Sequence, residues 1–272
     1  MKTLVLANQK GGVGKSAVAT LLVHYFAQHG QRVLAIDLDH QANFTKPLRQ
    51  SGRAAIAGFA ADALLTGTPP PLPAKPFVLV PSDRALLGLE RQPALHTPFA
   101  RAFRAFLASA HAQFDVCVID TNPNPDIRLI AALASADFVL SPIQLNQEAM
   151  DGVHGLLNHD RVGLRKIKAV LNPKLQLIGL LPTMVEPTPF QKANFVQVIQ
   201  QYRPLMIQVG SGPGEFAFVP RRSAIAEAQA IGAVLWEMKK TAARDARKEI
   251  EPGIARIAAV LSARESEHAP AA

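Results

Sequence analysis

Residues 10–16 of the chain are Lys-Gly-Gly-Val-Gly-Lys-Ser, and this glycine-rich stretch carries its strongest structural signal. It follows residues 3–7 (TLVLA), a continuous β-prone run, and precedes residues 17–29, a helical segment that ends at Gly30. Glycines between a strand and a helix let backbone N–H groups converge on an anion, and the helix N-terminus adds favourable partial charge. The stretch therefore predicts a loop that binds the phosphates of a nucleotide.

The residues that follow continue the alternation of strands and helices. Residues 32–37 (RVLAID) predict a second buried strand, and a strand–helix–strand unit implies a parallel sheet. The proline-rich stretch 67–76 is expected to be an exposed loop. Further strands are predicted at 77–81, 115–120, 137–142, 168–172 and 176–182, and helices at 98–112, 146–159, 189–202 and 223–263, the last with a break at Pro252. We expect an α/β fold, a mostly parallel twisted sheet with helices on both faces, in one domain over 1–264 with a flexible tail at 265–272.

Composition narrows the class of protein. The 272 residues are 49% apolar and 18% charged, which is typical of a soluble globular protein. No apolar run approaches the ~20 residues of a membrane span, no secretory signal is visible, and the single cysteine, Cys117, excludes an internal disulfide, so a cytoplasmic location is predicted. Lys and Arg number 29 against 21 Asp and Glu, a net charge of +8. This surplus favours nucleic acid or an anionic membrane as partner, although a merely basic enzyme has the same composition.

Two of the predicted strands end in aspartates. Asp37 and Asp39 end one of them, and Asp120 ends another. Because the carboxyl ends of parallel strands meet at the crevice that holds the phosphate loop, these carboxylates should converge there. Asp120 is the candidate for holding Mg²⁺ through water, with the Ser16 hydroxyl as a direct ligand, and Lys15 should reach the β- and γ-phosphates. Asp39 is the candidate for orienting the attacking water, close enough to belong to the metal site, with Asp37 as its support.

The loop departs from the general pattern G-x-x-x-x-G-K-[ST] at its start. Gln9 stands where that pattern has glycine, and Lys10 adds a second lysine. Lys10 is poorly placed for the phosphates of its own nucleotide, but in a face-to-face dimer it can reach those of the partner, as an arginine finger does. This loop resembles the deviant Walker A motif of the ParA/MinD family of P-loop NTPases. The catalytic candidates are therefore Lys10, Lys15, Asp39 and Asp120.

The resemblance extends over roughly residues 1–235. Asp39, Gln41, Asn43, Asp120, Thr121 and Pro123 match the family's two acidic segments. His40 replaces a usual proline, Ala42 a usual glycine, and Asn122 and Asn124 stand in the second segment, which puts the hydrolysis rate in doubt but not nucleotide binding. Similar segments occur at 140–156, 180–184 and 219–228. The nucleotide-binding residues that the resemblance implies are Lys10, Gly11, Gly12, Val13, Gly14, Lys15, Ser16 and Ala17, with Thr183, Met184 and Pro220 near the adenine.

The segment that follows, Trp236 to Arg244, is most similar to plasmid partition ATPases of the IncC/ParA type. The resemblance implies that ATP with Mg²⁺ joins two subunits in a sandwich dimer. The dimer is expected to coat nonspecific double-stranded DNA, hence the nucleoid, until a ParB-type centromere-binding partner triggers hydrolysis. We expect no helix-turn-helix extension of the kind that longer ParA proteins carry before the first strand.

Basic residues concentrate toward the C-terminus. Between 221 and 249 there are seven basic residues and four acidic ones, a net charge of +3. The predicted DNA-binding residues are Arg221, Arg222, Lys239, Lys240, Arg244, Arg247 and Lys248. Spacings of three and four predict that Lys240, Arg244, Arg247 and Lys248 share one helical face, which suits contacts to phosphates without base recognition. A solvated helix face with internal ion pairs is the alternative.

Other functions on the same fold stay open. A MinD-like membrane ATPase needs a bulky amphipathic C-terminal helix, whereas residues 253–264 are small and alanine-rich. An iron–sulfur reductase or an arsenite-pump ATPase needs several cysteines. A small-molecule kinase or ligase, and a nucleotide-gated binder that does not hydrolyse ATP, remain alternatives.

Overall fold

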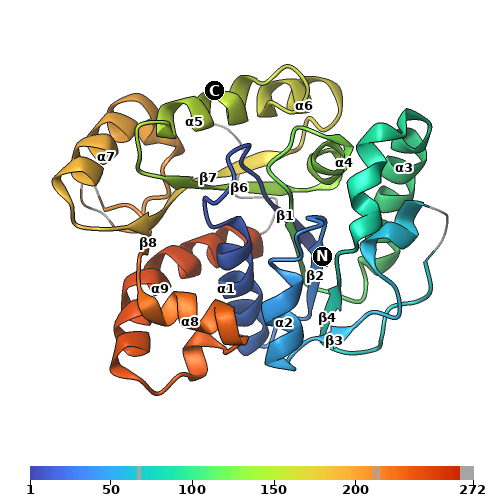
Figure 1. Ribbon diagram of the computed structural model, residues 1–272, viewed down its shortest axis with the longest axis horizontal. Coiled ribbons are helices and arrows are strands. Elements are labelled where there is room, and N and C mark those ends of the chain that lie inside the picture. The colour runs from blue at the N-terminus through green and yellow to red at the C-terminus, as the bar shows by residue number, and fades with distance from the viewer. Residues whose placement is uncertain (66–68, 211, 213–214, 264–272) are drawn as a thin grey trace.

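The computed structural model describes residues 1–65, 69–210, 212 and 215–263. These form a parallel sheet in the order β3-β4-β2-β5-β1-β6-β7-β8 (Figure 1). Its strands are β1 Lys2–Leu6, β2 Val33–Asp37, β3 Ala55–Ile56, β4 Phe77–Val80, β5 Val116–Asp120, β6 Phe138–Gln144, β7 Gln176–Val185 and β8 Val219–Pro220. The helices are α1 Lys15–Gln28, α2 Thr45–Ser51, α3 Pro93–Ala110, α4 Ile127–Ser135, α5 Ala149–Asn158, α6 Leu164–Val170, α7 Pro189–Tyr202, α8 Ser223–Ile231 and α9 Thr241–Ser262. The predicted α/β architecture, with its parallel sheet, is confirmed.

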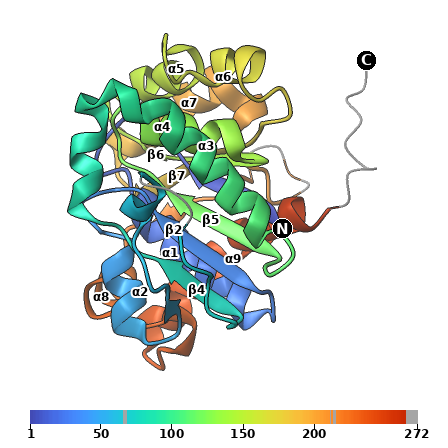
Figure 2. The same cartoon turned by 90° about the vertical axis from the view of Figure 1, so that its right-hand side faces the viewer.

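The sheet separates two hydrophobic cores, one on each face. Helices α3 to α7 pack over one face and α1, α2, α8 and α9 over the other, as Figures 1 and 2 show. Successive residues of a strand point to opposite faces, so Val5 joins the first core while Leu4 and Leu6 join the second. Strands buried on both faces explain the unbroken apolar runs by which the sequence predicted them.

Two predictions about the second half of the chain are wrong. Residues 168–172 were expected to form a strand, but 164–170 form α6, because Leu164 and Ile167 lie one turn apart and both enter the core. The region 223–263 is not broken at Pro252, which lies within α9 on an exposed position where water can solvate the freed carbonyl. The break comes instead at Gly232, whose φ of 67° ends α8 in the left-handed region.

Some elements carry little local signal and were not predicted. Helix α2, the edge strand β3 and the short β8 are seven, two and two residues long. No helix within the described ranges is long and apolar enough to pass through a membrane. The tail predicted at 265–272 lies outside the described residues.

Candidate nucleotide-binding site

The glycine-rich loop connects β1 to α1 at the carboxyl edge of the sheet. Gly12 and Gly14 have φ of 75° and 82°, a backbone region that side chains disfavour. Gly14 is also the N-cap residue directly before α1, and no side chain caps the helix there. The first amides of the helix are thus left facing the loop, as an anion site requires.

Neighbouring strands hold the loop in this shape. Thr183, at the end of β7, donates its hydroxyl to the Val13 carbonyl at 2.8 Å and lies 3.0 Å from the Ile143 carbonyl. Gln144, at the end of β6, donates to the Gly12 carbonyl at 3.1 Å. Thr183 is buried, so here it supports the loop rather than lining a cavity. Gln144 was missed, because nothing in its local sequence marks it as a neighbour of the loop.

Lys15 is buried at the base of the loop. Its Nζ donates to the carbonyl oxygens of Asn8, at 3.1 Å, and of Lys10, at 3.3 Å. Burial lowers the pKa of Lys15, while the carboxylates of Asp120 and Asp39 act in the opposite direction. A partly desolvated ammonium on carbonyl acceptors is ready to exchange those acceptors for phosphate oxygens, which carry full charge.

The two acidic strand ends meet as predicted from their positions. Asp37 and Asp120 are partners in the pairing of β2 with β5. Ser16 donates its hydroxyl to Asp120 Oδ2 at 2.6 Å, and Oδ1 of this fully buried residue has no partner among the described residues. Burial, followed by the nearby Asp37, raises the pKa of Asp120 well above its usual value. An unpartnered carboxylate oxygen beside a serine hydroxyl fits a hard divalent cation, held directly or through water.

Asp37 and Asp39 have different surroundings. Asp37 accepts from the amide and hydroxyl of Thr45, at 2.8 and 2.7 Å, and from the Asp39 amide at 3.0 Å. Burial, partly offset by these hydrogen bonds, raises its pKa to about 6. The Asp39 carboxylate accepts from the Gln41 amide at 3.0 Å and lines the cavity. Asp37 therefore shapes the turn, and Asp39 is the one that faces the space a nucleotide would occupy.

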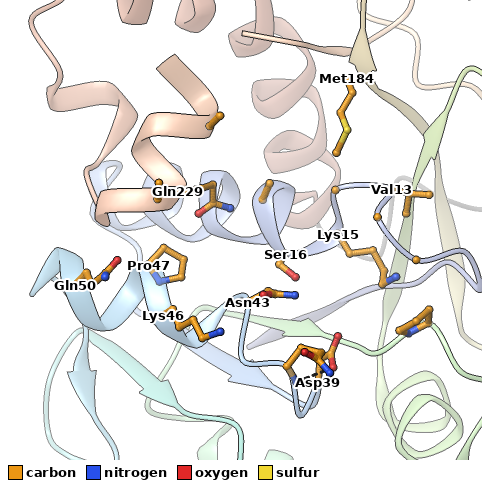
Figure 3. Close-up of a pocket in the computed structure, with 18 residues that line it drawn as sticks. Val13, Lys15, Ser16, Asp39, Asn43, Lys46, Pro47, Gln50, Met184 and Gln229 are labelled. Atoms are coloured by element: carbon orange, nitrogen blue, oxygen red, sulfur yellow. Dashed lines mark hydrogen bonds between the residues drawn. The ribbon is translucent and has the colours of Figure 1, made fainter. Parts of the chain in front are cut away.

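A cavity of about 720 Å³ opens in front of the loop (Figure 3). Gly11 to Ala17 form one wall, and Asp39, Gln41, Asn43 and Pro123 come from the two acidic strand ends. Helices α2 and α8, which lie side by side in Figures 1 and 2, close the far side with residues that the sequence did not single out, namely Lys46, Pro47, Gln50, Ala226, Gln229 and Ala230. Of the predicted adenine neighbours, Met184 lines the cavity, whereas Thr183 and Pro220 are buried outside its lining.

Lys10 does not point at the phosphate site of its own chain. Its Nζ forms an ion pair with Glu148, just before α5. The Lys10 side chain is 26% exposed and that of Glu148 70%, so the pair lies at the surface. The contact with Lys10 lowers the pKa of Glu148. An exposed ion pair of this kind holds a side chain weakly, and water or another anion can replace Glu148.

The structure pairs several of the predicted DNA-binding residues with acids. Arg221 pairs with Glu186, Arg222 with Glu249 and Lys240 with Glu227. Arg247 is half-buried and donates to the Trp236 carbonyl. Lys240 precedes α9, so it does not share a helical face with the others. Lys239, Arg244 and Lys248 are exposed and have no ion pair among the described residues.

The sequence is similar to proteins of known family. The family model described as an AAA domain matches residues 1–177. Protein IncC of Escherichia coli is 37% identical over 92% of this chain and 67% of its own length. The chromosome-partitioning ATPase Soj of Thermus thermophilus is 31% identical over 94% of this chain and 97% of its own. The chain belongs to the ParA-type partition ATPases.

A more distant structural relative has a different named activity. Cobyrinic acid a,c-diamide synthase of Mycobacterium smegmatis, solved with ADP and magnesium, is 25% identical, with a TM-score of 0.65 over 85% of this chain and 91% of its own. The fold of this ParA-type chain is thus similar to that of a synthase, and the fold alone does not decide the activity.

Proposed function

We propose that this ParA-type protein binds ATP with Mg²⁺ in the cavity and hydrolyses it. Ser16 and Asp120 would hold the cation, which supplies charge neutralisation for the phosphates, and Lys15 would bind the β- and γ-phosphates. Asp39 would orient the attacking water. The observation that carries the proposal is the Ser16–Asp120 pair, in which Ser16 ends the glycine-rich stretch and Asp120 keeps an unpartnered carboxylate oxygen.

The second lysine of the loop supports an ATP-dependent dimer. Within one chain Lys10 is held at the surface by Glu148, away from the cavity. In a face-to-face dimer Lys10 would leave Glu148 for the phosphates of the partner's ATP, which carry more negative charge than one carboxylate. Dimerisation and ATP binding would then depend on each other, because each supplies the other's contacts.

The dimer would bind nonspecific double-stranded DNA through basic residues near α9 and release it when a ParB-type centromere-binding protein stimulates hydrolysis. Lys239, Arg244 and Lys248, which are exposed and form no ion pair with a described acid, support this surface. Two copies of the surface on one dimer double the number of phosphate contacts, which makes binding depend on ATP. Such a dimer would be located on the nucleoid and would move a plasmid, a chromosome or another cargo.

The test is binding to a random-sequence duplex without nucleotide, with ADP and with ATP plus Mg²⁺, over a series of salt concentrations. Binding that requires ATP and falls steeply with salt is the expected result. A dimer that forms with ATP but does not bind DNA would contradict the partition surface while leaving the nucleotide site intact. In that case ATP-dependent sedimentation with anionic liposomes would favour the membrane alternative.

A further inference from the structure

A buried arginine connects the two loops that follow the acidic strand ends. Arg128 lies in the first turn of α4 and is 3% exposed. Its Nε donates to Asp126 Oδ2 at 3.0 Å, and its Nη1 lies 3.4 Å from both the Leu38 carbonyl and His40 Nδ1. One guanidinium therefore reaches from the loop after β5 to the loop after β2.

Both ends of this connection lie next to the nucleotide site. Since arginine can only donate, His40 Nδ1 is the acceptor in this contact, and His40 directly follows Asp39 in the chain. At the other end Asn122 donates to Asp126 Oδ2 at 2.7 Å, two residues after Asp120. The side-chain contacts thus run from His40, the residue after Asp39, through Arg128 and Asp126 to Asn122, the second residue after Asp120.

The guanidinium is not needed to begin α4. Asp126 Oδ1 caps the helix by accepting from the Arg128 backbone amide at 3.0 Å, a contact that any residue at 128 would provide. Burying an ion pair costs desolvation energy that the attraction between the charges does not reliably recover. Because the helix cap does not require the buried pair, the other contacts of the arginine account for it. These are with Leu38 and His40, in the loop that carries Asp39.

We propose that Arg128 is a positioning residue that makes the loops after β2 and β5 move as one unit when ATP binds. Asp39 and Asp120 then keep a fixed separation, so the attacking water and the metal stay aligned with the same phosphate. Arg128 acts on the loop after β2 through His40, and on the loop after β5 through Asp126, which accepts from Asn122; His40 and Asn122 are two departures from the family pattern. This proposal rests on the proposed ATP hydrolysis.

The variants separate positioning from folding. His40→Ala leaves the Asp126–Arg128 pair and the helix cap intact, and Arg128→Lys keeps a cation beside Asp126 but lacks the second nitrogen that reaches Leu38 and His40. Arg32→Met is the matched control. Arg32 pairs with exposed Asp115, and this pair joins the amino ends of the same two strands, β2 and β5, whose carboxyl ends carry the site.

We expect His40→Ala and Arg128→Lys each to lower kcat for ATP about 10- to 100-fold while KM changes less than about threefold. The double variant should be no slower than the slower single one, and Arg32→Met should match the wild type. A wild-type kcat in His40→Ala, or effects that multiply in the double variant, would overturn the proposal.

A second measurement does not require hydrolysis. Hydrogen exchange with the nonhydrolysable analogue AMPPNP and Mg²⁺ should protect residues 39–45 and 121–127 together in the wild type and only one of the two segments in His40→Ala. Equal protection of both segments in that variant would contradict the coupling. A wild-type protein that binds the analogue but never hydrolyses ATP would contradict the proposed function and leave the coupling to be decided by exchange.

Discussion

The nucleotide cavity and the basic surface near α9, formed by Lys239, Arg244 and Lys248, differ in how their charged side chains are buried and paired. At the cavity Lys15 and, behind Ser16, Asp120 are buried and held by backbone and hydroxyl groups, and Asp120 retains an unpartnered oxygen. Near α9 the cations are exposed, and acids such as Glu249 and Glu227 pair with some of them. Buried charges with free bonding capacity define a specific ligand, whereas exposed and partly neutralised ones provide weak, salt-sensitive attraction.

Removing the buried cation should have the largest effect. We expect Lys15→Ala to weaken ATP binding by at least about 100-fold, because charge-assisted hydrogen bonds to phosphate are lost in a desolvated site. A fluorescent ATP analogue measures the affinity directly. Lys46→Ala is the control, since Lys46 lines the same cavity outside the loop and should cost less than about fivefold. Equal losses in the two variants would show that the cavity binds by overall charge.

The stability of the folded protein should depend on pH through His24 of α1. His24 is buried against Phe77, and burial, opposed by Glu237, lowers its pKa to about 4. The unfolded chain binds the proton near pH 6.5, so the free energy of unfolding should fall as pH drops below that value. Between pH 7.5 and 5 the loss is about 2 kcal/mol.

Denaturant unfolding of wild type and His24→Phe at the two pH values measures this contribution. The variant should lose about 2 kcal/mol less on acidification than the wild type. His154→Gln, an exposed change on α5, should behave as the wild type. Parallel losses in wild type and His24→Phe would show that His24 does not resist protonation in the folded state.

Reversing charges on the basic surface should act on DNA alone. Arg244→Glu with Lys248→Glu is preferred to a pair that includes Arg247, because Arg247 supports the Trp236 carbonyl and its loss would disturb the fold. We expect DNA affinity to fall about 10-fold or more and the slope of affinity against salt to drop by about 2, with ATP binding unchanged. Lys166→Glu with Lys168→Glu, on α6 over the opposite face of the sheet, is the matched control. A similar loss in the control would point to net charge rather than a defined surface.

The smallest expected effect comes from removing the acid that pairs with Arg222. Glu249→Gln removes the acid that pairs with Arg222 and should raise DNA affinity by about two- to fivefold, since exposed ion pairs are worth under ~1 kcal/mol. Fluorescence anisotropy with a labelled duplex resolves this change. Unchanged affinity would place Arg222 outside the DNA surface.

The sequence predicted what depends on neighbours along the chain. The spacing of glycines from Gly11 to Gly14 requires only local backbone geometry, and Asp37 and Asp120 follow apolar runs that can only be buried strands. It failed at 168–172, where the same apolar residues suit a helix or a strand until their neighbours are known. It also placed the break of the last helices at Pro252, because a proline signal does not show whether water can solvate the freed carbonyl.

What the amino-acid order determined by itself was the class of ligand and the edge of the sheet at which it binds, since a phosphate loop and two acidic strand ends are short-range patterns. Tertiary structure decided which side chains complete that site. Gln144 and Gln229 come from segments far from the loop in sequence, and Lys10 is drawn to Glu148 only because α5 begins beside it. The same folding brought Arg128 beneath His40, and it paired several predicted DNA contacts with acids. Contacts of this kind depend on packing between distant segments, which a local pattern does not encode.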